Sequence, residues 1–205
     1  MNLFARGIKI IKEEGFYPFL KKFFNFFFNF FWQKIDWLLL PYFVIKIKNF
    51  NSNSVEEIVN FAFNSICKKI SPLQVKGEIL ELLKILEEKR PKYILEIGTA
   101  KGGTLFLFSR ISSEDATIIS IDLPGGKFGG GYSQWRSFLY KSFALPKQKI
   151  HLLRMDSHKE ETLEKVKTIL NGKKLNFLFI DGDHTYEGVK KDFEMYSPLV
   201  EEGGI

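Results

Sequence analysis

The sequence of 205 residues is poor in cysteine, and Cys67 is its single copy. One cysteine excludes an intrachain disulfide framework and a cysteine-based zinc site. It lies in an apolar-rich stretch, residues 61–67, which favours a buried structural thiol. A reducing, cytoplasmic compartment fits this cysteine usage.

Long uncharged runs are also missing. The longest of them, Phe23–Gln33, is too short to span a bilayer, which needs about 20 apolar residues. Extending the run to Leu40 brings Lys34 and Asp36 inside it, and Pro41 follows directly. The sequence therefore contains at best a poor transmembrane span.

Lys and Arg clearly outnumber Asp and Glu only in the first fifty residues of the chain. The first fifty residues hold eight Lys and Arg against three Asp and Glu, whereas the remaining 155 hold 22 and 21. Since no basic cluster recurs in the longer part, we do not expect a nucleic acid as a partner.

Phenylalanine is concentrated near the N-terminus, where the first fifty residues hold 12 of the 22 copies. Helical spacing leaves one narrow polar stripe on an otherwise apolar surface. The stripe consists of Lys22, Asn25, Asn29, Gln33 and Asp36. Three interpretations of this helix stay open. It lies in a membrane interface through residues 16–40, it packs on a partner or on the body of the protein, or it is a poor transmembrane span. The wide apolar face and the positive charge favour peripheral membrane contact.

Beyond this extension, residues 1–50, we expect a helical cap or linker, residues 51–91, and then an α/β domain, residues 92–205. The predicted strands are Tyr93–Ile97, Ala116–Ile121, Lys149–Arg154 and Leu175–Ile180. The predicted helices are Val55–Ile70, 73–90, Gly103–Ser112, Tyr132–Phe143, Lys159–Leu170 and Tyr186–Leu199. This alternation predicts a Rossmann-like, doubly wound parallel sheet with helices on both faces. A fifth strand is expected to begin at about Ile205, so we expect the sequence to be truncated at its C-terminus.

The end of the first predicted strand carries a glycine-rich turn, from Glu96 through Gly98 to Gly102 and Gly103. Glycines there let the backbone approach a ligand closely, and free N–H groups at the following helix suit a carboxylate or another anion. The spacing differs from the Gly-x-Gly-x-x-Gly of dinucleotide enzymes. A tight turn without a ligand is the alternative.

Carboxylates follow the next two strands. Asp122 comes 24 residues after Gly98, close to the ~20 expected of a residue that binds ribose hydroxyls. Asp156 ends the third strand, where it could face the amino group of a nucleobase. Together with Glu96, these residues place acids at three successive strand ends, which favours one shared site.

The fourth strand ends in Asp181-Gly-Asp183-His184-Thr-Tyr-Glu-Gly. Carboxylates in this position can bind Mg²⁺ or Ca²⁺, and an imidazole can act as a base near neutral pH. The alternative is a helix N-cap at Asp183 or Thr185, with His184 merely exposed.

The segments ILEIGTAKGG, IISIDLPGG, LLRMDSH, FLFIDGDHTYEGVKKDF and LVEEGG resemble the ordered motifs of class I S-adenosylmethionine (AdoMet) dependent methyltransferases. The resemblance covers roughly residues 70–205. Within the class, the chain is similar to the group that includes macrolide-sugar O-methyltransferases and cephalosporin-hydroxylase-like proteins. Catechol O-methyltransferase is a more distant relative.

The resemblance implies a role for each matching residue. Glu96, Gly98 and Gly102 would hold the methionine end of AdoMet, with Thr99 and Gly103 in the same turn. Asp122 would bind the ribose, and Asp156 with Ser157 would lie at the adenine. Asp181 matches both a cofactor contact and the first metal ligand of metal-dependent members, and His184 matches their catalytic base. The further acidic ligands of those relatives follow the fifth strand.

The sequence thus predicts an AdoMet-dependent O-methyltransferase that acts on a hydroxylated small molecule, a sugar or a glycan, with possible Mg²⁺ assistance. The alternative is a non-catalytic, membrane-associated binding or scaffold protein that keeps a nucleoside pocket. A homo-oligomer is compatible with either. Gln74 is a candidate for a helix that covers the site, and the glycine-rich residues 124–132 are either a mobile lid with Tyr132 and Trp135 or a surface loop.

Overall fold

The computed structural model describes residues 13, 15–18, 20, 35, 37–64, 68–125 and 131–205. The predicted polar stripe, Cys67 and the centre of the glycine-rich loop, residues 126–130, lie outside them. The chain divides into two compact units, Met1–Tyr42 and Phe43–Ile205. Of the helices that the structure describes, none has the length and apolar character needed to cross a membrane.

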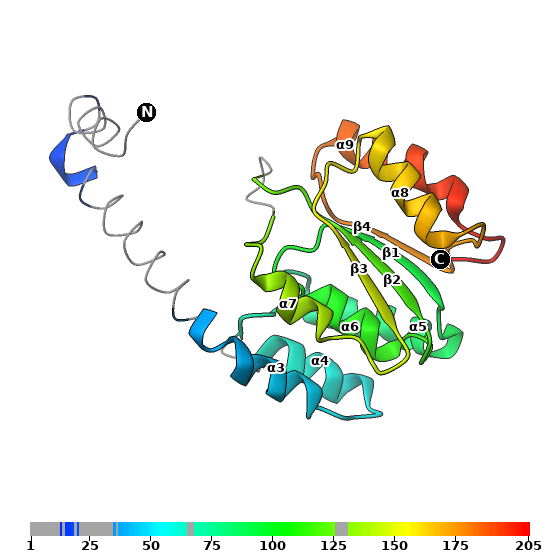
Figure 1. Ribbon diagram of the computed structural model, residues 1–205, viewed down its shortest axis with the longest axis horizontal. Coiled ribbons are helices and arrows are strands. Elements are labelled where there is room, and N and C mark those ends of the chain that lie inside the picture. The colour runs from blue at the N-terminus through cyan, green and yellow to red at the C-terminus, as the bar shows by residue number, and fades with distance from the viewer. Residues whose placement is uncertain are drawn as a thin grey trace. The chain divides into compact units, whose positions relative to one another are not determined.

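The second unit is built on a sheet of four parallel strands (Figure 1). They are β1 (Tyr93–Ile97), β2 (Thr117–Ile121), β3 (Lys149–Leu153) and β4 (Phe177–Ile180), in the spatial order β3-β2-β1-β4. In this order the strand after β1 lies on one side of it and β4 on the other. The chain therefore changes direction at β1, which is where ligands bind in open α/β sheets. The predicted parallel sheet of an open α/β fold is confirmed.

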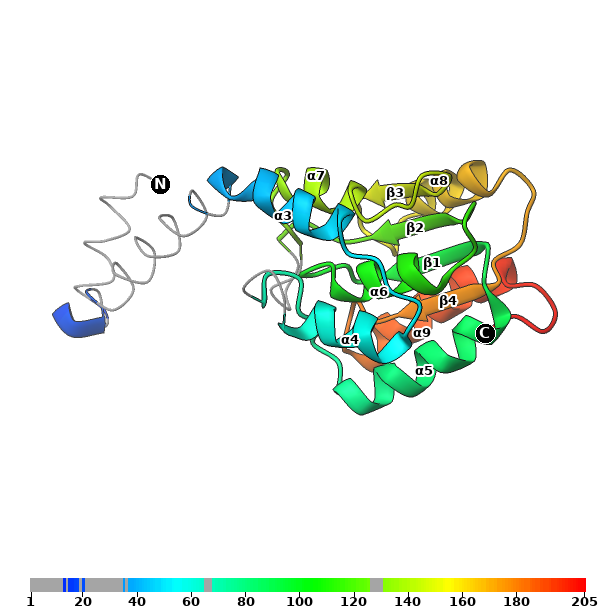
Figure 2. The same ribbon diagram turned by 90° about the horizontal axis from the view of Figure 1, so that it is seen from below.

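Helices cover both faces of the sheet. They are α3 (Leu40–Lys48), α4 (Val55–Asn64), α5 (Lys76–Lys89), α6 (Gly103–Ile111), α7 (Arg136–Lys141), α8 (Glu160–Leu170) and α9 (Tyr186–Tyr196), followed by the 3₁₀ turn η2 (Ser197–Leu199). Figures 1 and 2 show α8 and α9 on one face and α6 on the other. Buried Leu163 and Val166 of α8 pack with Leu95 of β1 and Ile119 of β2 in one core cluster.

Strand side chains alternate between these two faces. Leu95 faces α8, so its neighbours in the strand, Ile94 and Glu96, face α6. Phe108 of α6 packs edge-on against Phe177 of β4, with ring centroids 5.0 Å apart. This alternation places the Glu96 side chain on the face of the sheet that α6 covers.

Several helix boundaries differ from the prediction. The first helix of the cap ends at Asn64, not Ile70, and Lys68 has a positive φ of 59°, which is incompatible with a continuing right-handed helix. Helix α7 is shorter at both ends than the predicted Tyr132–Phe143. Tyr132 is buried instead, and Arg154 Nη2 donates to its carbonyl oxygen at 2.9 Å.

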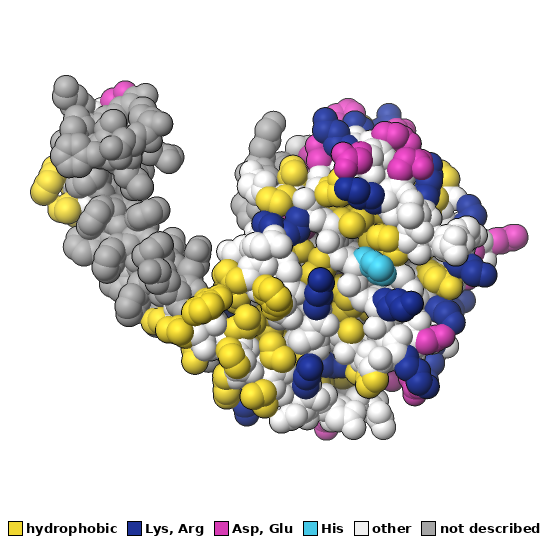
Figure 3. All heavy atoms as spheres, in the orientation of Figure 1, with side chains coloured by type: hydrophobic (Ala, Val, Ile, Leu, Met, Phe, Trp, Pro, Cys, Tyr) yellow, Lys and Arg dark blue, Asp and Glu magenta, His cyan; other side chains and the backbone are white. Residues whose placement is uncertain are grey.

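The chain after Tyr42 already belongs to the body of the protein. Phe43 and Ile47 of α3 are buried, and Arg110 Nη2 donates to the carbonyl of Ile47 at 3.1 Å. The second compact unit begins at Phe43, within the segment predicted as the N-terminal extension, residues 1–50. Apolar side chains gather on the surface over α3 and α7 (Figure 3), where Ile45 and Phe138 are 56% and 68% exposed.

Ile205 lies beside the outer edge of β4. Its backbone N–H donates to the carbonyl of Asn176 at 3.0 Å, and its carbonyl accepts from the N–H of Leu178 at 2.9 Å. This is the position where the sequence predicts a fifth strand to begin.

Candidate functional site

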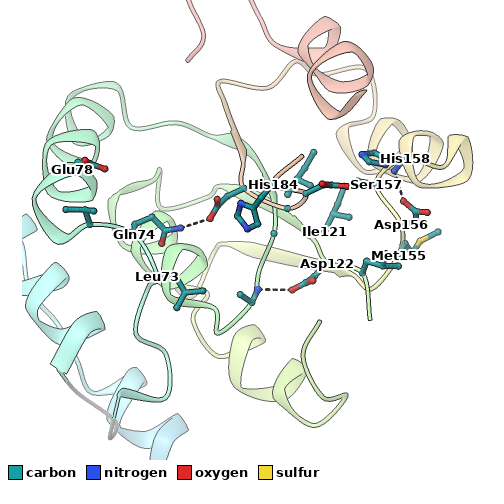
Figure 4. Close-up of a pocket in the computed structure, with 18 residues that line it drawn as sticks. Leu73, Gln74, Glu78, Ile121, Asp122, Met155, Asp156, Ser157, His158 and His184 are labelled. Atoms are coloured by element: carbon teal, nitrogen blue, oxygen red, sulfur yellow. Dashed lines mark hydrogen bonds between the residues drawn. The ribbon is translucent and has the colours of Figure 1, made fainter. Parts of the chain in front are cut away.

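A cavity of about 730 Å³ opens at the carboxyl ends of the four strands. Figure 4 shows its lining side chains, which come from the loops after each strand and from the segment that leads into α5. Its size is within the range usual for small-molecule and cofactor sites. Six of the predicted site residues line it: Gly98, Asp122, Asp156, Ser157, Asp181 and His184.

Gly98 brings the ends of β1 and β4 into contact. Its φ is +101°, and a Cβ atom placed on it would lie 2.6 Å from the carbonyl carbon of Asp181 and 2.9 Å from the nitrogen of Gly182. Only glycine combines this backbone conformation with such a close approach. Gly98 therefore helps to set the distance between two walls of the cavity.

Gly102 and Gly103 do not line the cavity. A Cβ on Gly102, whose φ is +80°, would meet the ring of Tyr140 at 2.6 Å, and one on Gly103 would lie 2.5 Å from the nitrogen of Pro72. Thr99 is buried, and its hydroxyl lies 2.5 Å from that of Ser120. The structure thus places these three predicted residues in the packing behind the turn.

Glu96 is also excluded from the cavity, because its position in β1 directs it toward α6. It is fully buried, and its carboxylate accepts hydrogen bonds from the hydroxyls of Thr104 and of Ser120, the latter at 2.6 Å. Burial raises the pKa of Glu96 to about 7, and the hydroxyl hydrogen bonds oppose that rise. The geometry favours a role in fixing the glycine-rich turn rather than direct contact with a ligand in the cavity.

Asp122 lies in the wall with both carboxylate oxygens already hydrogen-bonded. Oδ2 accepts from the N–H of Ala100 at 2.7 Å, and Oδ1 accepts from the N–H of Gly131 at 2.8 Å. Burial raises the pKa of Asp122, and these backbone hydrogen bonds lower it. The backbone N–H groups of Thr99 and Leu123 lower this pKa as well, so a ligand's donors would share the carboxylate's about four lone-pair sites with donors of the protein.

Asp156, Ser157 and His158 form the β3 end of the cavity. Asp156 Oδ1 accepts from the backbone N–H of His158 at 2.9 Å, which leaves its second oxygen for a ligand. The His158 ring is held from behind, since Nε2 lies 3.3 Å from Oδ1 of the buried Asp192 and 3.2 Å from the carbonyl of Gly188.

Asp181 and His184 belong to the loop between β4 and α9. Gln74 Nε2 donates to Asp181 Oδ2 at 2.6 Å, across 107 positions of the sequence. Burial raises the pKa of Asp181, whereas His184 and Gln74 lower it. His184, labelled in Figure 4, lines the same cavity as Asp181. A carboxylate and an imidazole therefore face the same space, as acid–base chemistry requires.

The helix-cap interpretation of this loop holds for its other residues. Thr185 Oγ1 accepts from the N–H of Gly188 at 3.1 Å and so caps α9. Asp183 Oδ1 accepts from the N–H of Thr185 at 2.8 Å. Capping occupies Asp183 and Thr185 but not Asp181, and the site roles of Asp181 and His184 stay predictions.

Comparison with known proteins agrees with this geometry. The profile of a methyltransferase domain family matches residues 95–205, more than half of the chain. This chain belongs to the methyltransferase domain family. It is 32% identical over 126 residues to an uncharacterized protein of Acanthamoeba polyphaga mimivirus, a match that covers 62% of this chain and 54% of the relative. The chain thus spans about half the length of that relative.

A solved structure shares the methyltransferase fold. It is a Staphylococcus aureus protein provisionally assigned as a caffeoyl-CoA O-methyltransferase, with a TM-score of 0.51 and 23% identity over 82% of this chain and 70% of that one. At this identity the likeness shows the fold alone.

Two residues at or behind this cavity make contacts that the sequence analysis does not predict. Gln74 was proposed only as part of a covering helix, but it lies in the segment before α5 and touches Asp181 directly. Asp192 had no assigned role. The signal for it is helical spacing, because Gly188, Asp192 and Tyr196 are the buried residues of α9, and a carboxylate among inward-facing positions needs a partner.

The predicted Mg²⁺ has no ligand set in the part of the chain that the structure describes. There, no three His, Cys, Asp or Glu side chains lie together in a way that could hold a metal ion. Asp181 is a single acidic ligand, and one of its oxygens is engaged by Gln74. Metal assistance stays a prediction.

Proposed function

We propose that this methyltransferase uses AdoMet and transfers its methyl group to a hydroxyl oxygen of a small molecule or a sugar. The supporting observation is that Asp122, Asp156 and Asp181, which follow three different strands, line one cavity of about 730 Å³. Carboxyl ends of parallel strands meet at one edge of a sheet, so residues far apart in sequence act on one ligand.

The residues present suit the parts of AdoMet. Asp122 lines the cavity where its carboxylate can accept from the ribose hydroxyls beside its backbone donors, and Asp156 keeps one oxygen for the adenine amino group. The positive sulfonium suits a wall of carboxylates, because opposite charges attract strongly where water is excluded. When bound, AdoMet supplies an electrophilic methyl group.

The chain's own residues align and activate the acceptor. Catalysis of an SN2 transfer rests mainly on holding the acceptor oxygen in line with the methyl group. His184 takes the proton of the acceptor hydroxyl, and Asp181, fixed by Gln74 at 2.6 Å, stabilises the imidazolium that forms. This order of events is that of general base catalysis.

The test uses methyl-labelled AdoMet, a panel of hydroxylated compounds and the His184→Ala variant. We expect His184→Ala to lose nearly all turnover, with AdoMet affinity close to wild type. Glu187→Ala is the control, because Glu187 is exposed on the next turn and does not line the cavity. Full turnover in His184→Ala would remove the proposed base, and failure to bind AdoMet would remove the proposed function.

Peripheral membrane contact through residues 16–40, a homo-oligomeric state and a cytoplasmic location stay predictions of the sequence. The membrane segment falls mostly on residues outside those described.

A further inference from the structure

The cavity walls are acidic, although the chain as a whole is basic. Lys and Arg outnumber Asp and Glu by 30 to 24 in the sequence. Among the described residues that line the cavity, none is Lys or Arg, whereas five carry carboxylates. These five are Glu78, Asp122, Asp156, Asp181 and Asp183.

The carboxylates are divided between two ends of the cavity. Asp122 and Asp156 lie at the end assigned to the nucleoside. Glu78 lies at the opposite end, together with the segment that carries Leu73 and Gln74 (Figure 4). One bound sulfonium adds a single positive charge, so it cannot neutralise five carboxylates. The acceptor therefore enters a space that stays negative.

The acceptor end is also apolar. Leu73 and Val75 line it and are 71% and 63% exposed, so a ligand could cover them. Gln74, between these two residues, is held by its hydrogen bond to Asp181.

We infer that the methyl acceptor is an uncharged or cationic hydroxyl compound with an apolar part, and that the cavity rejects anionic acceptors such as CoA thioesters and phosphorylated compounds. This inference rests on the proposed function, because it concerns the same cavity. Like charges placed close together weaken binding, so the carboxylates of the wall exclude anionic acceptors as well as attract cationic ones.

The test uses three probes that share one 4-hydroxyphenyl scaffold: tyramine, tyrosol and 4-hydroxyphenylacetate, which are cationic, neutral and anionic. Each is titrated by calorimetry into the full chain saturated with S-adenosylhomocysteine. We expect tyramine to bind at least about tenfold more tightly than 4-hydroxyphenylacetate, with tyrosol between them, and the difference to shrink as salt is added. Equal affinities, a reversed order, or no binding of any probe would overturn the inference.

The Glu78→Gln variant locates the effect. It should lower the preference for tyramine over 4-hydroxyphenylacetate by about threefold, the usual weight of one exposed charge pair. Glu88→Gln is the matched control, because Glu88 is exposed on the same helix and does not line the cavity. If Glu88→Gln lowers the preference for tyramine as much as Glu78→Gln does, the preference does not arise from the carboxylates of the cavity wall, and the inference is overturned.

The two levels of the proposal fail separately. The chain is titrated with S-adenosylhomocysteine before any probe is added, and absence of binding at that stage would refute the proposed function. Normal binding of it, followed by a preference for the anionic probe, would refute only the inference on acceptor charge.

Discussion

Replacing Gly98 by alanine tests the contact between the ends of β1 and β4 that shapes the cavity. The added Cβ would lie 2.6 Å from the carbonyl carbon of Asp181 and 2.9 Å from the nitrogen of Gly182, on a backbone with φ of +101°. The backbone conformation costs about 1–3 kcal/mol for a non-glycine residue. The steric overlap costs about 1–3 kcal/mol more, since backbone atoms must shift. We therefore expect Gly98→Ala to lower the free energy of unfolding by roughly 2–6 kcal/mol.

Two other glycines separate these contributions. Gly172→Ala keeps the positive φ, +78°, with nothing within 4 Å of the new Cβ, so it should cost only about 1–2 kcal/mol. Gly77→Ala lies inside α5, also with nothing within 4 Å, and should stabilise the protein by about 0.5–1 kcal/mol. Urea denaturation of the three variants provides the values. A loss in Gly98→Ala no larger than that in Gly172→Ala would refute the close contact.

Three further changes probe the site. Because the pKa of buried Glu96 is raised from 4.5 to about 7, the folded protein keeps a proton that the unfolded chain loses in this range, so the free energy of unfolding should fall by about 3 kcal/mol from pH 4.5 to 7. Glu96→Gln should remove that decline in urea titrations across the same pH range. Asp122→Ala should weaken S-adenosylhomocysteine binding by about 10- to 100-fold in calorimetry, whereas Asp115→Ala, an exposed change outside the cavity lining, should leave it unchanged. Gln74→Leu should lower turnover by about tenfold while that affinity stays within twofold, because it frees Asp181 without touching the nucleoside end; equal losses in both would contradict this positioning role.

The positions of the strands in the chain could be predicted from the sequence because apolar runs between turn residues are local signals. The bounds of β1 agree with the prediction at both ends, and α9 begins at the predicted Tyr186. The shortening of α7 could not be predicted, because it follows from the burial of Tyr132 and its contact with Arg154, a residue of a different loop.

The predicted site residues differ in where the structure places them. Asp122, Asp156 and Asp181 follow strand ends, and topology alone brings such residues together. Glu96 is the last residue but one of β1, so strand alternation directs it to the face covered by α6. A carboxylate near a strand end is therefore a weaker indication of ligand contact when a strand residue still follows it.

The other contacts of the site could not be predicted, because they join residues that lie far apart in the sequence. Gln74 meets Asp181 from 107 positions away, and no local pattern marks that contact. The pair of His158 and Asp192 is similar, since its 3.3 Å separation depends on how α9 packs on the sheet. Such contacts require the packed structure.

The most direct test of AdoMet binding in this cavity is a crystal structure of the full chain with S-adenosylhomocysteine. We predict one molecule in the cavity, with its ribose hydroxyls at Asp122, its adenine at Asp156 and its sulfur toward His184. Clear density for the ligand elsewhere, or a cavity that stays empty at saturating concentration, would contradict it.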